Sequence, residues 1–357
     1  MLKEERNVSE LKAKSEALKA MSGKDRKKAL GDLFMNNAMF IIIAIAIVLI
    51  ALKEPSFVSI PSIVNIVNLT AAKLPIALGV GGCIILAGTD VSAGRQVGLA
   101  ACIAASLQLT TNKLFPDMGV QAWYVALLAV VVVGAALGFV NGFCMAKFKL
   151  HPYIVTLSTQ LIIYGIILLY LQLGTNSGQT LSGMNPAYRE LITGELFKIG
   201  NTVVPMYVLY SLIITIVVWV IWNKTTFGKN MYAVGSNEEA ANVSGVNVVK
   251  TIIMVFMMAG ALYGITGFMD AARIASVNAT TGLNYEADAI AACVIGGISF
   301  VGGIGKVSGA IIGVLLLQVI FTGLTYLSVD QNLLFIVKGL IILVACAIDM
   351  RKYLVRK

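Results

Sequence analysis

The chain has 357 residues, of which 58% are hydrophobic and only 13% are charged. Soluble domains carry about 25% charged residues, so this composition indicates an integral membrane protein and excludes a large soluble domain. The net charge of +9 comes from residues at the ends of apolar segments and not from one basic patch, which argues against nucleic-acid binding.

The first 34 residues mix Lys and Arg with Asp and Glu, and the first apolar run begins only near Ala38. That run lacks a following small-residue cleavage pattern, so we do not interpret the region as a secretory signal. We expect a cytoplasmic tail over 1–34 and a transmembrane domain over 35–350. Within that domain we place a cytoplasmic loop at 223–250, and a short cytoplasmic tail follows at 351–357.

Apolar segments recur along the transmembrane region, and a span requires about 20 such residues. They predict an all-α, polytopic membrane protein with about ten transmembrane helices, some of them broken or re-entrant. Ten crossings place both termini on the same side. The segments lie near 38–52, 63–88, 96–111, 122–146, 153–173, 206–222, 251–269, 289–303, 307–327 and 333–349.

Two segments differ from a simple span. The 63–88 segment is too long for one straight helix and has Lys73 and Pro75 at its centre, so we expect it to break there. The 289–303 segment is short and rich in glycine, which predicts a partial or re-entrant span. Near the end of the last segment, Lys338 can extend its ammonium group to the membrane surface.

Glycines spaced by four residues recur inside the apolar segments. This spacing is typical of membrane helices whose backbones pack closely. It occurs at positions 134, 138 and 142, and again at 260 and 264.

The distribution of Lys and Arg indicates the orientation. With both termini in the cytoplasm, most of the 27 Lys and Arg residues fall on the cytoplasmic side, as the positive-inside rule requires. This orientation places the 174–204 connection outside. The residues assigned to the outer side are Lys53, Lys113, Arg189, Lys198 and Arg273.

The 223–250 loop is the longest polar connection on the cytoplasmic side. Ser236 and Glu239 have the spacing of a capping box that begins a short helix, and Gly245 can end it in a left-handed conformation. Such a helix suits a groove on a cytoplasmic partner, with a solvated turn as the alternative. We expect its acidic residues to face outward and its inner face to consist of Ala240, Ala241 and Val243. The residues assigned to docking are Ser236, Asn237, Glu238, Glu239, Ala240, Ser244 and Gly245.

Three pairs of ionisable residues flank apolar segments, namely Asp90 with Arg95, Asp270 with Arg273, and Glu286 with Asp288. Charged groups in or near a membrane either pair or face a cavity. For Asp90, at the start of a helix, we favour structural capping over contact with a transported solute. Asp270 and Arg273 have the spacing of an ion pair within one helix.

Catalytic and nucleotide-binding signals are missing from the sequence. The single histidine, His151, is interpreted as a loop residue at the membrane surface, and the five cysteines form no CxxC pair, so neither a metal nor a cofactor is expected. The stretch GGIGKVSG fails as a phosphate-binding loop because Val307 follows Lys306. If ATP drives transport, another polypeptide must bind it.

Five motifs occur in order between residues 38 and 350. Together they resemble the permease subunit of sugar-importing ABC transporters, the family that takes up ribose, xylose, arabinose and galactosides. Within that family, GRQVGLAA and VSGVNV are most similar to the galactose and methyl galactoside importers. Ala287 departs from the pattern, which usually has Leu. The motifs are GTDVSAGRQVGLAA at 88–101, VNGFCMAKFKLHPYIVTLSTQ at 140–160, FGKNMYAVGSNEEAANVSGVNV at 227–248, YEADAIAACVIGGISFVGGIGKVSGAIIG at 285–313, and the closing basic tail.

The resemblance implies a multi-pass protein of the bacterial inner membrane, embedded in lipid, in which two copies form a pore. It also implies a cytoplasmic ABC ATPase that binds ATP and an external sugar-binding protein. The loop helix then becomes a coupling helix seated on the ATPase. The substrate-pathway candidates are polar residues within or near the spans, namely Asp90, Asn141, Gln160 and Tyr164.

Two other classes of protein are alternatives to this interpretation. An ion-coupled secondary sugar transporter needs buried carboxylates near the membrane midplane, whereas the acids here are expected at the ends of spans. A membrane enzyme needs a catalytic group of residues, and the sequence shows none.

Overall fold

A computed structural model describes residues 44–354, apart from 46, 112, 113, 116, 118 and 175. The chain divides into two compact units, Met1–Leu49 and Ile50–Lys357, and all elements described below belong to the second. The expected tail over 1–34, the first part of the 38–52 segment and the last three residues of the chain lie outside the described residues.

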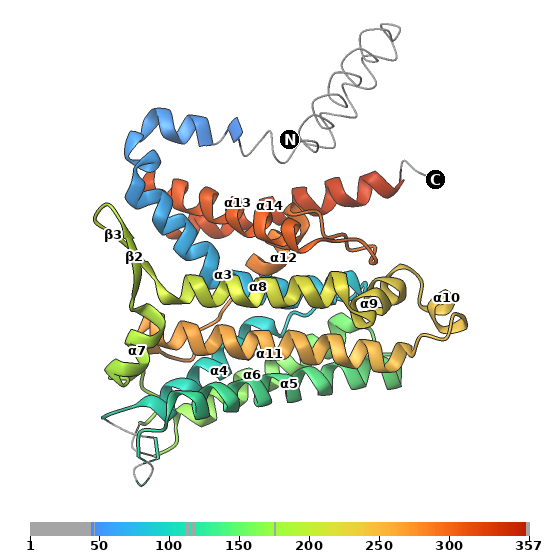
Figure 1. Cartoon of the computed structure of the whole chain (residues 1–357), viewed down its shortest axis with the longest axis horizontal. Helices are drawn as coiled ribbons and strands as arrows, with labels where there is room; N and C mark the ends of the chain where they lie inside the picture. Colours follow the sequence, from blue (N-terminus) through green and yellow to red (C-terminus); the bar gives the residue numbers. More distant parts are fainter. Residues whose placement is uncertain are drawn as a thin grey trace, which may run out of the picture. The chain divides into compact units, whose positions relative to one another are not determined.

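Helices form most of the second unit (Figure 1). Two short antiparallel pairs of strands accompany them: β1 (Leu181–Ser182) with β4 (Ser276–Val277), and β2 (Glu195–Ile199) with β3 (Thr202–Pro205). The helices are the 3-10 helix η1 (Pro55–Val58), α3 (Ile60–Ile85), α4 (Ala93–Gln108), α5 (Trp123–Phe148), α6 (Pro152–Leu171), α7 (Pro186–Thr193), α8 (Met206–Lys224), α9 (Thr226–Ser236), α10 (Glu238–Val243), α11 (Val248–Ile274), α12 (Tyr285–Ile295), α13 (Val307–Tyr326) and α14 (Gln331–Leu354).

Six of the described helices are long and apolar enough to cross a membrane, namely α3, α5, α6, α8, α11 and α13. The expected number of about ten is therefore not confirmed. α4, with 16 residues, is about 24 Å long, and α12, with 11 residues, is about 16 Å long, against about 30 Å of hydrocarbon. In α14 the apolar stretch covers only Asn332–Val344.

The expected break in the 63–88 segment is wrong. α3 continues without interruption from Ile60 to Ile85 and contains Pro75 in its interior. A proline removes one backbone hydrogen bond, but Pro75 is buried where α3 packs against α11, α12 and α13. These contacts hold the helix continuous through the proline.

The expected partial span near 289–303 has a counterpart in the structure. α12 begins at Tyr285 and ends at Ile295, and the residues between β4 and α12 form turns. A glycine turn follows α12, with Gly297 at a φ of +83°. The chain therefore combines a non-helical stretch with a half-length helix in this region.

Helix α11 lies against both α4 and α5, and its contact with α5 depends on glycine. A Cβ atom on Gly134 of α5 would meet the carbonyl oxygen of Gly260 in α11, and a Cβ on Gly260 would meet the carbonyl oxygen of Gly134. The two backbones touch at this point, as the glycine spacing predicts. Close approach of this kind increases dispersion contacts between helices where lipid supplies no hydrophobic drive.

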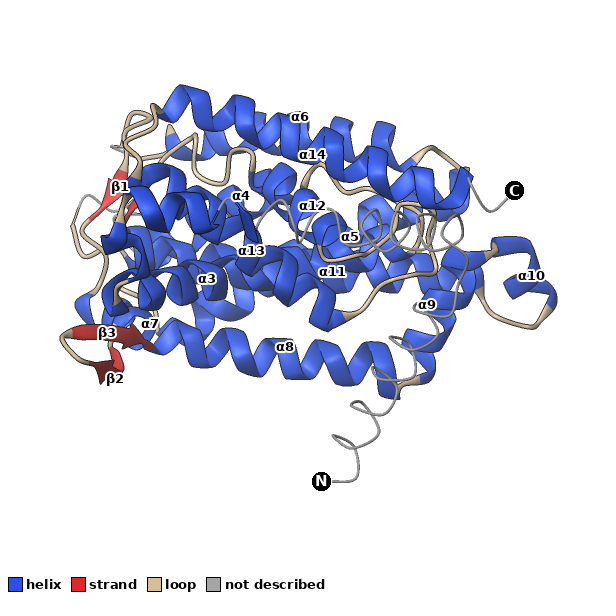
Figure 2. Cartoon of the chain, turned by 90° about the horizontal axis from the view of Figure 1, so that it is seen from above, coloured by secondary structure: helices blue, strands red, loops and turns tan. Residues whose placement is uncertain are grey.

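The connection between α6 and α8 and the connection between α8 and α11 lie at opposite ends of the helices. The first contains β1, α7, β2 and β3, and the second contains α9 and α10 (Figure 2). α14 ends at the same end of the bundle as α9 and α10 (Figure 1). The two connections are thus separated as they must be if they face opposite sides of a membrane.

Candidate functional site

The first candidate site is the short helix α10, which stands away from the long helices beside α9 (Figure 2). Its N-cap is Asn237, whose Oδ1 accepts a hydrogen bond from the amide of Ala240 at 2.8 Å. The expected capping box of Ser236 with Glu239 is wrong, because Ser236 is the last residue of α9. Asn237 has the extended backbone that a cap requires, with φ at −163°.

The end of α10 agrees with the expectation from the sequence. Gly245 has a φ of +85°, the left-handed conformation that a glycine after a helix favours. The hydroxyl of Ser244 donates to the carbonyl oxygen of Ala240 at 2.8 Å, which satisfies one of the last carbonyl groups. α10 therefore consists of about one and a half turns, and both of its ends are capped.

The buried side of α10 is smaller than expected. Ala241 is buried and packs in an apolar cluster with Val234 and Val248. Ala240 is exposed, and Val243 is 90% exposed, so their expected inward placement is wrong. A helix of six residues presents only a narrow face to its own chain. Val243 is left as an apolar side chain on the outside.

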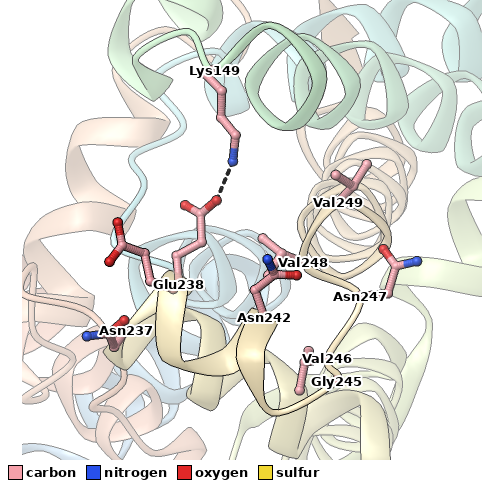
Figure 3. A pocket seen from close by; sticks show the side chains of 10 residues that line it. Lys149, Asn237, Glu238, Asn242, Gly245, Val246, Asn247, Val248 and Val249 are labelled. Atoms are coloured by element: carbon pink, nitrogen blue, oxygen red, sulfur yellow. Dashed lines mark hydrogen bonds and ion pairs between the residues drawn. The ribbon is translucent and has the colours of Figure 1, made fainter.

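A concave surface that encloses a volume of about 890 Å³ lies between α10 and the C-terminal end of α5 (Figure 3). Lys149 crosses it and forms an ion pair with Glu238. Both side chains are largely exposed, so the pair contributes less than about 1 kcal/mol. Glu239 remains exposed. The surface is lined by Lys149, Asn237, Glu238, Glu239, Asn242, Gly245, Val246, Asn247, Val248 and Val249.

The second candidate site is a buried polar network at the start of α4. Oδ1 of Asp90 accepts from the amide of Ser92 at 3.0 Å and from its hydroxyl at 2.5 Å. The hydroxyl oxygen of Ser92 in turn accepts from Gln96 at 2.9 Å and from Asn141 at 3.1 Å. Thr159 of α6 donates to Oδ1 of Asn141 at 2.6 Å. Asp90 thus binds Ser92, the residue just before α4, which is a structural role other than the expected capping of the helix amides.

Two of the four pathway candidates, Asp90 and Asn141, are brought together by this network, and both are fully buried. Hydrogen-bonded polar networks of this kind hold helices in one arrangement. Sequence reasoning missed the central residue, Ser92, although its position two residues after Asp90 is the spacing of a local side-chain turn. It also missed Gln96 and Thr159, for which the sequence carried no comparable signal.

The other two pathway candidates, Gln160 and Tyr164, lie on α6 outside this network. Gln160 is half-buried, and Tyr164 is 36% exposed. The guanidinium carbon of Arg95 lies 4.3 Å from the centre of the Tyr164 ring, within the range of a cation–π contact. Arg95 therefore contacts Tyr164 and not Asp90, with which the sequence had grouped it.

The acidic residues differ in position. Asp270 lies four residues before the end of α11, whereas Glu286 lies inside the helical bundle against Gly94 of α4. Asp270 pairs with Arg273 at 2.8 Å, as their spacing predicts. Glu286 and Asp288 belong to the first turn of the half-length helix α12, and Glu286 is buried. Lys338 pairs with Asp288 at 2.9 Å, so its expected extension to the membrane surface is wrong. The position of the acids therefore no longer separates an ATP-driven importer from an ion-coupled transporter.

His151 lies exposed at the N-cap of α6. Its Nδ1 accepts a hydrogen bond from the amide of Tyr153 at 3.3 Å. A surface position is thus observed for the one histidine of the chain.

Comparison with known proteins identifies the class. Residues 62–346 match the family described as branched-chain amino acid transport system / permease component, and the chain belongs to this family. It is a multi-pass membrane permease component, and this class favours the ABC importer over the ion-coupled secondary transporter. No solved structure matches the chain.

Similar proteins cover almost the whole chain. The galactose/methyl galactoside import permease protein of Haemophilus influenzae is 42% identical over 94% of this chain and 100% of its own length. The protein of the same name from Escherichia coli K12 is 40% identical over 93% of this chain and 98% of its own. The ribose import permease protein of Haemophilus influenzae is 32% identical over 90% of this chain and 94% of its own.

Proposed function

We propose that this chain forms the translocation pathway of an ATP-driven importer for galactose or methyl galactoside. The observation that carries the proposal is the 42% identity to a galactose/methyl galactoside permease over that protein's full length. The ribose permease is more distant, at 32%. Specificity for a hexose is therefore favoured over specificity for a pentose.

The proposed assembly contains two copies of this chain in the lipid bilayer of the bacterial inner membrane. A cytoplasmic ABC ATPase binds and hydrolyses ATP, and an external binding protein delivers the sugar. Both termini face the cytoplasm in this arrangement. The separation of α7 and the strand pair β2–β3 from α9 and α10 at opposite ends of the bundle is compatible with it (Figure 2).

α10 is the proposed contact with the ATPase. Its exposed side combines an apolar residue, Val243, with a free acidic residue, Glu239, beside a concave surface. An apolar anchor with charged neighbours is the usual composition of a small docking surface. Ala241 of α10 packs against Val248 at the start of α11, so a movement of α10 is passed to a membrane-spanning helix through a buried contact.

We assign two different roles to the pathway candidates. Asp90 and Asn141 are buried and hydrogen-bonded, which supports a role in holding α4 against α5 and α6. Gln160 and Tyr164 are partly exposed on α6 and remain the proposed contacts with the passing sugar. A passage must release its cargo, so few and weak contacts are expected.

The test is reconstitution of the chain in liposomes with its ATPase and the loaded binding protein. We expect uptake of radiolabelled galactose that requires ATP on the side of the membrane where the ATPase lies. Unlabelled methyl galactoside should inhibit this uptake. Excess ribose should compete poorly. Uptake driven by a proton or sodium gradient without the ATPase would contradict the proposal. Preferential ATP-dependent uptake of ribose would support an ATP-driven importer but contradict galactose as its cargo.

A further inference from the structure

The residues between β4 and α12, 278–284, lie against α4 and form turns in place of a helix. They run along α4 at van der Waals distance, because a Cβ on Gly98 would meet the carbonyl oxygen of Thr281 and a Cβ on Gly94 would meet that of Gly282. Gly282 itself has a φ of +80° and packs on the backbone of Gly94. We refer to residues 278–284 as the inner loop.

The inner loop is held by one side chain of α4. Nη1 of Arg95 donates to the carbonyl oxygen of Ala279 at 2.9 Å, while its guanidinium carbon lies 4.3 Å from the centre of the Tyr164 ring. Tyr164 lies seven residues before the end of α6 at Leu171, which is about 10 Å along the helix. The contact is thus within the hydrocarbon thickness of about 30 Å, away from both surfaces.

Polar groups of the inner loop are exposed at this depth. Asn278 and Thr280 are both exposed. Oδ1 of Asn278 accepts from the amide of Thr280 at 2.9 Å and from its hydroxyl at 2.7 Å. The NH2 group of Asn278 and the acceptor lone pairs of the Thr280 hydroxyl are left for other partners. Irregular backbone with polar side chains is not stable against lipid, and it occurs at membrane depth only inside protein or along a water-filled cavity.

We propose that the inner loop lines the sugar pathway, with Asn278 and Thr280 as contacts for sugar hydroxyls and Arg95 as the residue that positions them beside Tyr164. This inference rests on the proposed function for the identity of the cargo. The NH2 group of Asn278 can donate and the Thr280 hydroxyl oxygen can accept, which together match a sugar hydroxyl, and an exposed tyrosine ring can cover the apolar face of a hexose. The inner loop adds to Gln160 and Tyr164 a second wall that the sequence did not indicate.

Accessibility to water tests the placement without reference to the cargo. In a chain whose five native cysteines are replaced, Asn278→Cys and Thr280→Cys are each compared with Ile216→Cys. Ile216 is 53% exposed and lies on α8, a helix that is long and apolar enough to cross a membrane, so we expect it to face lipid. The full transporter in nanodiscs is treated with a small charged methanethiosulfonate.

We expect both inner-loop variants to react at least tenfold faster than Ile216→Cys. Reaction as slow as that of Ile216→Cys, from contact with lipid or from cover by the second copy, would overturn the placement. Fast reaction in a transporter that fails to import galactose would retain the pathway and reject only the proposed cargo.

Transport tests the role of the side chains. Asn278→Ala and Arg95→Lys are expected to lower galactose uptake at least fivefold per ATP hydrolysed, while stimulation of ATP hydrolysis by the loaded binding protein stays within twofold. Arg95→Lys keeps the charge but loses the planar group that reaches both Ala279 and Tyr164. Equal losses of uptake and stimulated hydrolysis would assign these residues to folding or coupling and overturn the proposed contact. Thr280→Ser, which keeps the hydroxyl, should retain uptake.

Discussion

The ammonium group of Lys338 in α14 lies 2.9 Å from Oδ1 of Asp288 in the first turn of α12. The side chains are 24% and 15% exposed, respectively. Asp288 is thus stabilised twice, by the opposite charge and by the positive end of the α12 dipole. The pair joins α12 to α14 through two residues that are 50 positions apart in the chain.

Asp288→Asn should destabilise the protein by about 1 to 3 kcal/mol, because Lys338 then stays charged without its partner in a mostly buried place. The measurement is thermal unfolding of the purified protein in detergent. Glu195→Gln is the matched control, since it breaks the exposed pair with Lys198 and should cost less than about 1 kcal/mol. The double variant Asp288→Asn, Lys338→Met should recover most of the loss. Equal unfolding temperatures for Asp288→Asn and the control would contradict the importance of the pair.

Labelling of single cysteines in an otherwise cysteine-free chain tests the orientation of the protein in the membrane. Ser177, in the connection that contains β1, and Ser236, at the end of α9, are both exposed and lie at opposite ends of the bundle. An impermeant thiol reagent applied to intact cells should label Ser177→Cys and should reach Ser236→Cys only after the membrane is opened. The reverse labelling pattern would invert the proposed orientation and place α10 out of reach of a cytoplasmic ATPase.

Ser236 and Asn237 are neighbours, but only Asn237 caps α10. Asn237→Ala should cost about 1 kcal/mol of local helix stability because the amide of Ala240 loses its acceptor. Ser236→Ala should cost only a few tenths, since Ser236 belongs to α9 and caps nothing in α10. Hydrogen exchange of the α10 amides, measured by mass spectrometry, compares the two variants. Faster exchange in Ser236→Ala than in Asn237→Ala would support Ser236 and not Asn237 as the N-cap of α10.

Gly245 allows backbone strain to be tested apart from steric clash. No atom lies within 4 Å of a Cβ built there, so Gly245→Val acts through its φ of +85°, at a cost of about 1 to 3 kcal/mol to the exit from α10. Gly245→Asn is the control because asparagine tolerates this conformation. Uptake of sugar per inserted protein should fall sharply for the valine variant and stay near the wild-type rate for the asparagine variant. Normal uptake by both would show that the shape of this loop is unimportant for coupling.

Local patterns in the sequence predicted several parts of this structure well. Gly245 ends α10 because its position after a short polar helix is a local signal, and Asp270 pairs with Arg273 because the two are three residues apart on one helix. The glycine spacing at 134 and 260 likewise indicated close helix packing at these positions, which the contact of α5 with α11 shows. Each of these predictions depends on neighbours within a few residues or on a repeated spacing.

Features that depend on distant neighbours were not predictable in the same way. Pro75 stays inside a continuous α3 because α11, α12 and α13 surround it, and no local pattern reports these helices. Asp288 meets Lys338 only after α12 and α14 have packed together. The inner loop contacts Arg95 across 184 positions of the chain, so its place beside Tyr164 required the fold.

The contacts between glycine and backbone also have a mechanical consequence. A carbonyl oxygen fills the place of a side chain where Gly134 meets Gly260, and the same holds where Gly313 of α13 meets Ala292 of α12. Pairs packed in this way resist gradual sliding, so we expect α5 with α11 and α12 with α13 to move as two rigid pairs. α3 contacts both pairs, and Pro75 removes one hydrogen bond from its interior. We therefore expect a relative movement of the two pairs to bend α3 at the proline.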